Sequence, residues 1–125
     1  EQRPLAFHCS HGVHRTGTAA AILLSALGVP WETIRKDYLL TNELRADQNK
    51  ATLARIRAKV AEARGVETET LDMTNVEAFY VLEGSYIDGT LEAAKQKYGS
   101  MDAYIREGLG LSEADLDKLR ASLLE

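Results

Sequence analysis

The start of the chain, where a short apolar stretch passes through a loop into a long apolar run, constrains the fold most. Residues Leu5–Cys9 are bounded by Pro4 and a glycine-containing loop, and this pattern predicts a buried β-strand. The run TGTAAAILLSALG, which begins at Thr16, predicts a buried helix that ends at Gly28. The chain therefore begins with one strand, and the patterns that follow it are helical.

The remainder predicts a series of helices. Pro30 is placed to be the first residue of the second helix, and a basic amphipathic helix over residues 50–64 stops at Gly65. The later helices are predicted from capping and stop signals, which are Thr74 with Glu77, Thr90 to Gly99, Ser100 to Gly108, and Ser112 with Asp115.

A single strand leaves its edge groups unpaired. Either the helices bury it, or its partner strands belong to a segment upstream of this chain. We favour the second interpretation, because the first residue is Glu1 rather than Met and the strand pattern follows almost at once. The fold class predicted is α/β, and the 125 residues are expected to be the C-terminal part of one domain, with a loop over residues 8–17 and a helical remainder over 18–125.

Charge is divided unevenly along the chain. Residues 1–66 hold ten Lys/Arg against six Asp/Glu, a net charge of +4, and residues 67–125 hold five against thirteen, a net charge of −8. The basic half contains the loop and suits an anionic ligand there, although two ordinary solvated surfaces explain the pattern equally well. No basic tract is interleaved with aromatic residues, so nucleic acid is not an expected partner.

Cysteine content and hydropathy narrow the class of protein further. One cysteine forms no internal disulfide, and Cys–His metal spacing is absent, so no metal site is expected. The longest apolar run, Ala19–Leu24, is far shorter than the ~20 residues that span a bilayer. We expect a cytoplasmic protein without a membrane partner. Secretion stays open as an alternative, because the sequence starts at Glu1 and does not show whether a leader sequence precedes it.

The most informative motif is Cys9-Ser10-His11-Gly12-Val13-His14-Arg15, followed by Thr16 and Gly17. A loop that ends at a helix N-terminus presents successive backbone N–H groups to one point, which makes an anion cradle. The guanidinium of Arg15 can hold two phosphate oxygens, and the same field lowers the pKa of Cys9, with His8 and Thr16 placed to help. A thiolate beneath a phosphoryl group is a nucleophile aimed at phosphorus.

These residues carry a family resemblance. HCSHGVHRTG resembles the phosphate loop of cysteine-dependent protein tyrosine phosphatases, whose signature is HCxxGxxR followed by Ser or Thr. The segments TAAAILLSALGVPWETIRKDYLLTNE and YGSMDAYIREGLGLSEADLDKLRASLL are similar to the bacterial tyrosine/serine phosphatase family with atypical dual-specificity members. The resemblance covers nearly the whole chain and implies the protein tyrosine phosphatase fold, of which this chain would be the C-terminal part.

The resemblance implies a role for each matched position. Cys9 would be the nucleophile, Arg15 the ligand of the phosphate and the transition state, Thr16 would assist departure of the thiolate, and His8 would tune its pKa. The phosphate would be bound by the loop, that is by Ser10, His11, Gly12, Val13, His14 and Arg15. The implied substrate is a phosphotyrosine, and also a phosphoserine or phosphothreonine, of a protein or peptide, hydrolysed through a phosphocysteine intermediate without metal or cofactor.

The chain departs from the family in two ways. Many members have Gly-Lys-Asp-Arg where this chain has Gly12-Val13-His14-Arg15; the Lys is associated with activity on phosphoinositide headgroups, and the Asp is a proposed general acid. His14 is thus an even choice between general acid and bystander. The upstream strands and the acid loop of relatives are also absent from this chain, so two alternatives stay open: a phosphate-binding module without turnover, or a fragment that needs a complementary N-terminal segment or associates with a second copy through its exposed strand.

Ordinary structural roles compete with functional ones elsewhere. His8 is favoured as a hydrogen-bonded structural residue over a proton-transfer group, and His11 as an exposed loop residue. Packing is favoured over recognition for two further sets, which are Asp37, Tyr38 and Asn42, and the tyrosines Tyr80, Tyr86, Tyr98 and Tyr104.

Overall fold

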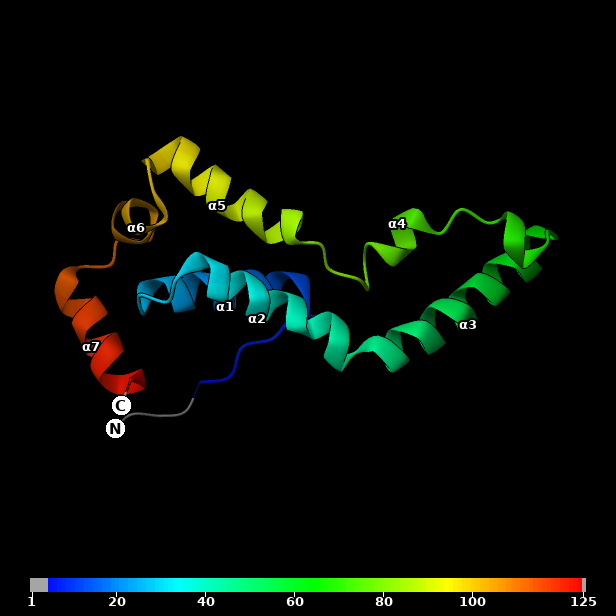
Figure 1. Cartoon of the computed structure of the whole chain (residues 1–125), viewed down its shortest axis with the longest axis horizontal. Coiled ribbons are helices and arrows are strands. Elements are labelled where there is room, and N and C mark those ends of the chain that lie inside the picture. Colours follow the sequence, from blue (N-terminus) through cyan, green and yellow to red (C-terminus); the bar gives the residue numbers. More distant parts are fainter. Residues whose placement is uncertain (1–4, 125) are drawn as a thin grey trace.

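The computed structural model describes residues 5–124, and its regular structure is helical (Figure 1). The four longest helices are α1, α2, α3 and α5; short turns join α1 to α2 and α2 to α3, and residues 65–83 connect α3 to α5. In chain order the elements are α1 (His14–Ala26), α2 (Trp31–Leu44), α3 (Ala46–Arg64), the 3₁₀ turn η1 (Thr68–Thr70), α4 (Thr74–Glu77), α5 (Gly84–Tyr98), α6 (Met101–Ala103), the π-helical turn η2 (Tyr104–Gly108) and α7 (Glu113–Leu123).

The predicted strand Leu5–Cys9 is not formed. These residues have no regular structure, and no strand occurs anywhere in residues 5–124. Leu5 is 88% exposed and Phe7 45% exposed, so the segment is not buried either. A strand exists only when a neighbouring strand supplies hydrogen-bond partners, and residues 5–124 contain none. The α/β class is therefore not found in the described residues, which are helical.

The body of the molecule is formed by α1, α2, α5, α6, η2 and α7. Its first core cluster packs α1 and α2 against α5 and includes Ile34, Tyr38 and Ile87, and its second joins the end of α1 to Ile105 and Leu116. The four named Ile and Leu side chains are the largest fully buried ones among the described residues. Burial of this apolar surface is the main favourable contribution to the packing.

Gly17 permits the close approach of α1 and α2. A Cβ built on Gly17 would lie 2.6 Å from Cε2 and 2.7 Å from Cδ2 of Tyr38, well inside van der Waals contact. The ring of Tyr38 is 6% exposed and belongs to the first core cluster. The expectation that Tyr38 packs between helices is confirmed.

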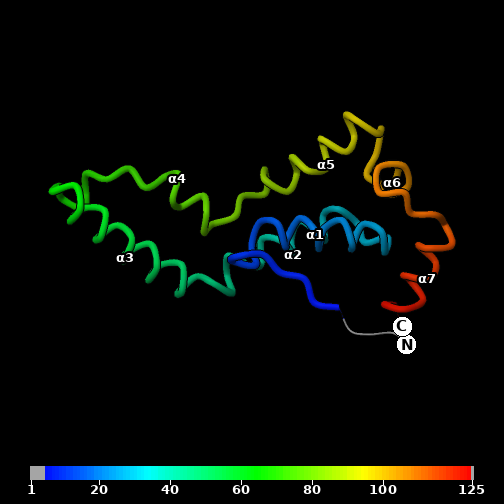
Figure 2. The backbone as a smooth tube through the Cα atoms, turned by 180° about the vertical axis from the view of Figure 1, so that it is seen from behind, coloured from blue at the N-terminus to red at the C-terminus, as the bar shows by residue number. Residues whose placement is uncertain are grey.

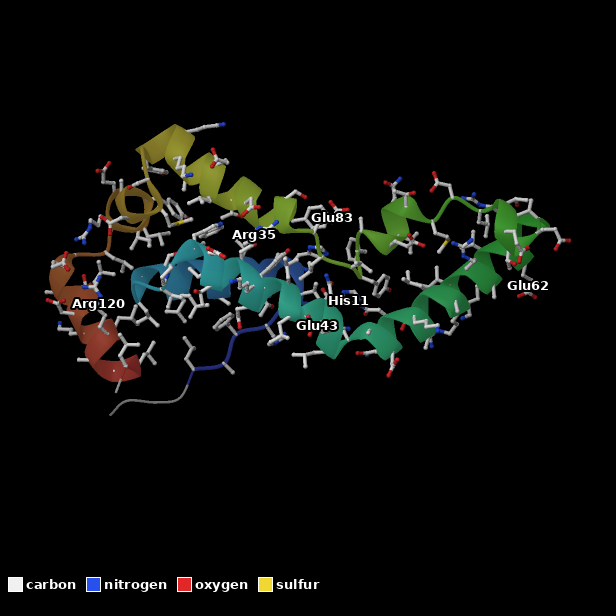
Figure 3. The ribbon with its side chains drawn as sticks, in the orientation of Figure 1. His11, Arg35, Glu43, Glu62, Glu83 and Arg120 are labelled. Carbon is white, nitrogen blue, oxygen red and sulfur yellow. The ribbon has the colours of Figure 1, made fainter. Side chains whose placement is uncertain are left out.

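Polar contacts also join α2 to α5. One carboxylate, Asp88, accepts hydrogen bonds from Nε1 of Trp31 at 3.0 Å and from Nε of Arg35 at 2.9 Å. These two donors, Trp31 first, hold the pKa of Asp88 below its usual value. Arg35 lies between the two helices near the N-terminus of α5 (Figure 3).

Helix α3, η1 and α4 form an arm that extends away from the body, as both ribbon views show (Figures 1 and 2). The arm has a small core of its own, formed by Ala61, Leu71 and Met73. Arg57 fastens its two sides together by donating to the carbonyl of Thr68 at 3.0 Å. The arm returns to the body through the linker at residues 78–83, which is the segment that matters for the site.

Several helix ends were predicted correctly. Gly65 and Gly99 are left-handed C-caps, with φ of 65° and 88°. Ser100 caps the helix that follows it, and Ser112 with Asp115 forms a capping box.

The starts of α2, α3 and α5 were predicted less well. Pro30 is the N-cap of α2 rather than its first residue, and α3 begins at Ala46 rather than at residue 50. Helix α5 begins at Gly84, not at Thr90, because burial of Ile87 to 1% exposure rewards a helix there despite two glycines.

The capping box expected at Thr74 is also wrong. The backbone N–H of Thr74 instead donates a hydrogen bond to the carboxylate of Asp72 at 2.9 Å.

Candidate active site

The site is built on the turn that leads into α1. Residues Cys9–Val13 form an irregular bend, and His14 begins the helix two residues earlier than predicted. Gly12 has φ of +67°, the left-handed conformation that glycine adopts without strain. Val13, the N-cap, is 3% exposed and fixes the end of the loop in the first core cluster. The loop is thereby held with its backbone N–H groups near the cysteine.

The pKa of Cys9 is lowered from 9.0 to about 5. The largest cause is the side-chain hydroxyl of Thr16, followed by the backbone N–H groups of Thr16, His11 and Val13. Cys9 is half-buried, and the small desolvation opposes these effects without overcoming them. Cys9 is therefore a thiolate at neutral pH, and the donors around its sulfur are the backbone cradle predicted from the sequence.

The Thr16 hydroxyl lowers the pKa of Cys9 more than any other group, yet it forms no regular hydrogen bond with the described residues. Its Oγ1 is buried and satisfies hydrogen-bond geometry with none of the residues between 5 and 124. The Thr16 hydroxyl and the backbone N–H groups of Thr16, His11 and Val13 therefore act on the Cys9 sulfur as nearby dipoles. A buried hydroxyl without a regular partner is costly, which is the kind of feature found where a ligand or a reacting atom completes the bonding.

Arg15 lies across the mouth of the loop. Its Nη2 donates to Oγ of Ser10 at 3.2 Å, and the side chain is exposed. Arg15 and Cys9 both line a pocket of about 670 Å³, together with Ser10, His11 and His14. A positive fork and a thiolate in one pocket fit a phosphate ester placed between them.

The opposite wall of this pocket comes from a distant part of the chain. Asn75, Ala78, Phe79 and Tyr86 supply it, from α4, the linker and α5. Phe79 is 58% exposed, and its ring lies 5.8 Å from that of His11. The wall is thus aromatic and accessible from solvent.

Hydrogen bonds hold the linker against the ends of α2 and α3 that face each other. Asn42 uses both atoms of its amide, donating to the carbonyl of Leu82 and accepting from its N–H, each at 2.8 Å. Nδ2 of Asn49, a buried side chain, donates to the carbonyl of Tyr80 at 2.7 Å. Because Asn42 and Asn49 sit on either side of the junction between α2 and α3, this junction sets the position of the wall.

The same junction reaches the phosphate loop. Nη1 of Arg45 donates to the carbonyl of His11, while its Nε is buried and lacks a partner among the residues described. His11 lies where the arm meets the body, next to the linker (Figure 3). His11 is exposed as predicted, yet its ring packs edge-on against Phe79 and Tyr80, so it also joins the loop to the wall.

Comparison with known proteins decides the family. The sequence profile of the tyrosine phosphatase family matches residues 1–125. The chain belongs to the tyrosine phosphatase family.

Two relatives of this tyrosine phosphatase chain are informative. A Cupriavidus necator protein, named provisionally as a tyrosine-protein phosphatase, is 37% identical over 122 residues, which are 98% of this chain and 40% of that protein. The triple specificity protein phosphatase PtpB of Mycobacterium tuberculosis is 27% identical over 131 residues, which are 98% of this chain and 44% of that protein. The chain thus spans less than half the length of both relatives.

The two histidines with predicted roles occupy different positions in this phosphatase loop. Nδ1 of His8 lies 3.3 Å from the carbonyl oxygen of Cys9, and His8 is not among the groups that lower the Cys9 pKa. Nε2 of His14 donates to the carbonyl of Phe79 at 3.2 Å. A carbonyl only accepts, so this nitrogen carries a proton, and Nδ1 is the atom of His14 left for any exchange with substrate.

The aromatic wall is the part of the site that sequence reasoning missed. Tyr86 was assigned to packing and Phe79 was not singled out, although both line the pocket that contains Cys9 and Arg15. The local signal is the adjacent aromatic pair Phe79-Tyr80, of which Phe79 is exposed, in the linker between α4 and α5. No spacing rule connects these residues to a loop some seventy positions earlier.

Neither a metal centre nor a membrane span is found in the described chain. Residues 5–124 contain no group of three or more His, Cys, Asp or Glu that could hold a metal ion. Within the same range no helix combines the length and apolar character needed to cross a bilayer.

Proposed function

We propose that this chain carries the nucleophile and phosphate loop of a phosphatase that hydrolyses phosphotyrosine monoesters through a phosphocysteine intermediate. The observation that supports it most is the Cys9 thiolate, with a pKa of about 5, in one pocket with the Arg15 guanidinium. Membership of the tyrosine phosphatase family supports the same reaction. We include phosphoserine and phosphothreonine in the proposal, and a relative named for triple specificity fits a substrate range broader than one class.

The proposed reaction has two displacements at phosphorus. Cys9 Sγ attacks phosphorus, an S–P bond forms, the P–O bond to the tyrosine breaks, and the departing phenolate takes a proton from water. A second water then attacks phosphorus, the S–P bond breaks, and inorganic phosphate and the Cys9 thiolate are released. Arg15 and the loop N–H groups would stabilise the negative charge on the three equatorial oxygens in both steps, and the Thr16 hydroxyl would stabilise the departing thiolate.

The aromatic wall favours an aryl ester over an alkyl ester. The phosphorylated side chain would enter between the loop and the rings of Phe79 and Tyr86, which line the same pocket as Cys9. Contact with two rings adds about 0.5–1.5 kcal/mol per aromatic pair beyond simple burial. A phosphoserine would reach Cys9 but would leave these contacts unmade.

The decisive experiment replaces the nucleophile. Cys9→Ser should abolish turnover of phosphotyrosine and of nitrophenyl phosphate while vanadate still binds, because the cradle consists of backbone and Arg15. Arg15→Lys should also be severely impaired, since a point charge does not replace a two-pronged donor. Arg64→Lys, on the exposed end of α3, is the matched control and should retain turnover. Turnover near the unmodified level in the Cys9→Ser protein would refute the assignment.

One observation favours a second candidate, a chain that acts only with a complementary segment. Leu5 and Phe7, just before the proposed nucleophile, are 88% and 45% exposed on a segment that has no regular structure and no partner strand in residues 5–124. An added strand would cover both side chains and support the loop. Turnover that appears only when an upstream segment of the natural protein is supplied would establish this form, and full turnover by residues 1–125 alone would reject it.

A further inference from the structure

A second cavity adjoins the catalytic pocket. It measures about 520 Å³ and lies between α1, α5 and η2, with Tyr86 as a wall that it shares with the first pocket. No step of the proposed reaction uses it. Because it shares the Tyr86 wall with the pocket that contains Cys9, it is a candidate for binding a part of the substrate other than the phosphorylated side chain.

The two cavities form one groove along α1. His14 lines the first pocket, and Thr18 and Ile22 line the second. Residues four apart lie on the same face of a helix, at steps of ~6 Å along its axis. Tyr86, Thr90, Ala94 and Tyr98 repeat at the same spacing of four on the facing side of α5, and all of them line the second cavity. A ligand that leaves the first pocket along α1 therefore enters the second.

The second cavity has an apolar floor and an aromatic end. Ile22 and the buried Ala94 form part of the floor. Tyr98 and Tyr104 close the end with ring centroids 5.3 Å apart, and within residues 5–124 neither phenol makes a hydrogen bond. Nζ of Lys97 lies 5.3 Å from the centroid of the Tyr98 ring and brings a positive charge to the rim. An apolar side chain with polar backbone around it fits these walls.

The aromatic end depends on the π-helical turn. A Cβ on Gly108 would lie 2.5 Å from the ring of Tyr104 and 2.9 Å from that of Tyr98, so both rings occupy space that only glycine leaves. A π-helical turn is rare, and such turns are frequent at functional sites. The turn therefore places these two rings rather than merely ending α6.

We infer that the second cavity is a substrate subsite that binds the aromatic or aliphatic side chain two residues away from the phosphotyrosine. In an extended peptide, side chains at positions i and i+2 point to the same side and lie ~7 Å apart, close to the step from His14 to Thr18 along α1. Lys97 at the rim would favour an acidic residue beside that side chain. The inference rests on the proposed function, since it assumes a phosphotyrosine in the first pocket.

The test compares two phosphotyrosine peptides, one with Phe two positions from the phosphotyrosine on either side and one with Gly at both places. Binding is measured in the Cys9→Ser form of the natural full-length protein. The Phe peptide should bind roughly 10-fold or more tightly, as burial of an aromatic side chain predicts. Gly89→Phe should remove this difference, because Gly89 lines the second cavity but not the first, and a Cβ at this position meets open space.

Two further variants keep the test decisive. Gln96→Phe places the same side chain on an exposed position of α5 outside both cavities, and the preference for the Phe peptide should persist. Ala93→Leu fills the second cavity with a smaller side chain and should reduce the preference if Gly89→Phe does not fold. Equal binding of both peptides by the Cys9→Ser protein, or a preference that survives a folded Gly89→Phe protein, would overturn the subsite.

The outcomes separate the subsite from the proposed reaction. Turnover of nitrophenyl phosphate, which has no flanking residues, tests the reaction alone. The proposed reaction fails and the subsite stands if the protein with Cys9 intact does not turn over nitrophenyl phosphate, while the Cys9→Ser protein prefers the Phe peptide and loses this preference when Gly89→Phe is added. If turnover is present and the two peptides bind equally, the reaction stands and the subsite fails.

Discussion

Replacing Thr16 with valine tests how the loop stabilises the Cys9 thiolate. The structure places the pKa of Cys9 at about 5, with the Thr16 hydroxyl as the largest cause and three backbone N–H groups behind it. Thr16→Val keeps the shape of the side chain and removes the hydroxyl. The pKa of Cys9 should therefore rise toward 9.0 without reaching it, because the backbone donors stay in place.

The pH midpoint is the quantity to measure, and the rate at pH 7 is not. At pH 7 a thiol with a pKa of 9.0 is roughly 1% ionised and one with a pKa of about 5 roughly 99%. The lower pKa also weakens the nucleophile, by roughly 40- to 100-fold at a Brønsted slope of 0.4–0.5 over that difference. The two effects nearly cancel, so a normal rate at pH 7 says little.

The assay is the rate of reaction with dithiodipyridine from about pH 4 to pH 10. Because Cys9 is the only cysteine of the sequence, the signal reports that residue alone. The midpoint should lie near 5 in the unmodified protein and higher in Thr16→Val. Thr33→Val, exposed on α2, is the control and should leave the midpoint unchanged. A midpoint near 9 in the unmodified protein, or the same midpoint in the unmodified and the Thr16→Val proteins, would refute the reasoning.

Three further predictions follow from the packing around the loop. His14→Ala should slow the turnover of phosphotyrosine and of nitrophenyl phosphate alike, since Nε2 of His14 holds the linker that carries the aromatic wall. A loss of turnover of roughly 10²-fold that is confined to phosphotyrosine in the pH–rate profile would instead make His14 the general acid. Gly17→Ala should lower the free energy of unfolding by roughly 1–2 kcal/mol, because overpacking against Tyr38 exceeds the gain in helix propensity. Gly89→Ala, where a Cβ meets open space, should raise the free energy of unfolding slightly, and calorimetry measures both changes. Asn42→Ala should cost about 1–3 kcal/mol by leaving the linker backbone unpaired, with a raised KM, and an unchanged melting temperature would contradict it.

Local sequence was sufficient for the loop and for the helix ends with a strong terminating signal. Cys9 to Thr16 are contiguous, so a bend at Gly12 and a helix start suffice to direct N–H groups at the sulfur. Gly65 and Gly99 end their helices because the left-handed conformation they adopt is available to glycine at little cost. These features depend on residues within one or two turns of one another.

The strand prediction shows where local reasoning stops. Leu5–Cys9 has the composition of a strand, but a strand is defined by the partner that pairs with it, and residues 5–124 offer none. Helix α5 shows the reverse case, because Gly84–Thr90 has poor helix propensity and becomes helical through the burial of Ile87.

The sequence by itself determined the chemistry of the site, namely a thiolate, an arginine and a ring of backbone donors at one helix N-terminus. Only the tertiary structure decided what stands opposite them. Asn42 and Asn49 bind the backbone of the linker, and this brings Phe79 to the loop across some seventy residues. Such contacts pair a side chain with backbone groups that every residue possesses, so no pattern in the sequence marks the partner, and the geometry of the packed helices selects it.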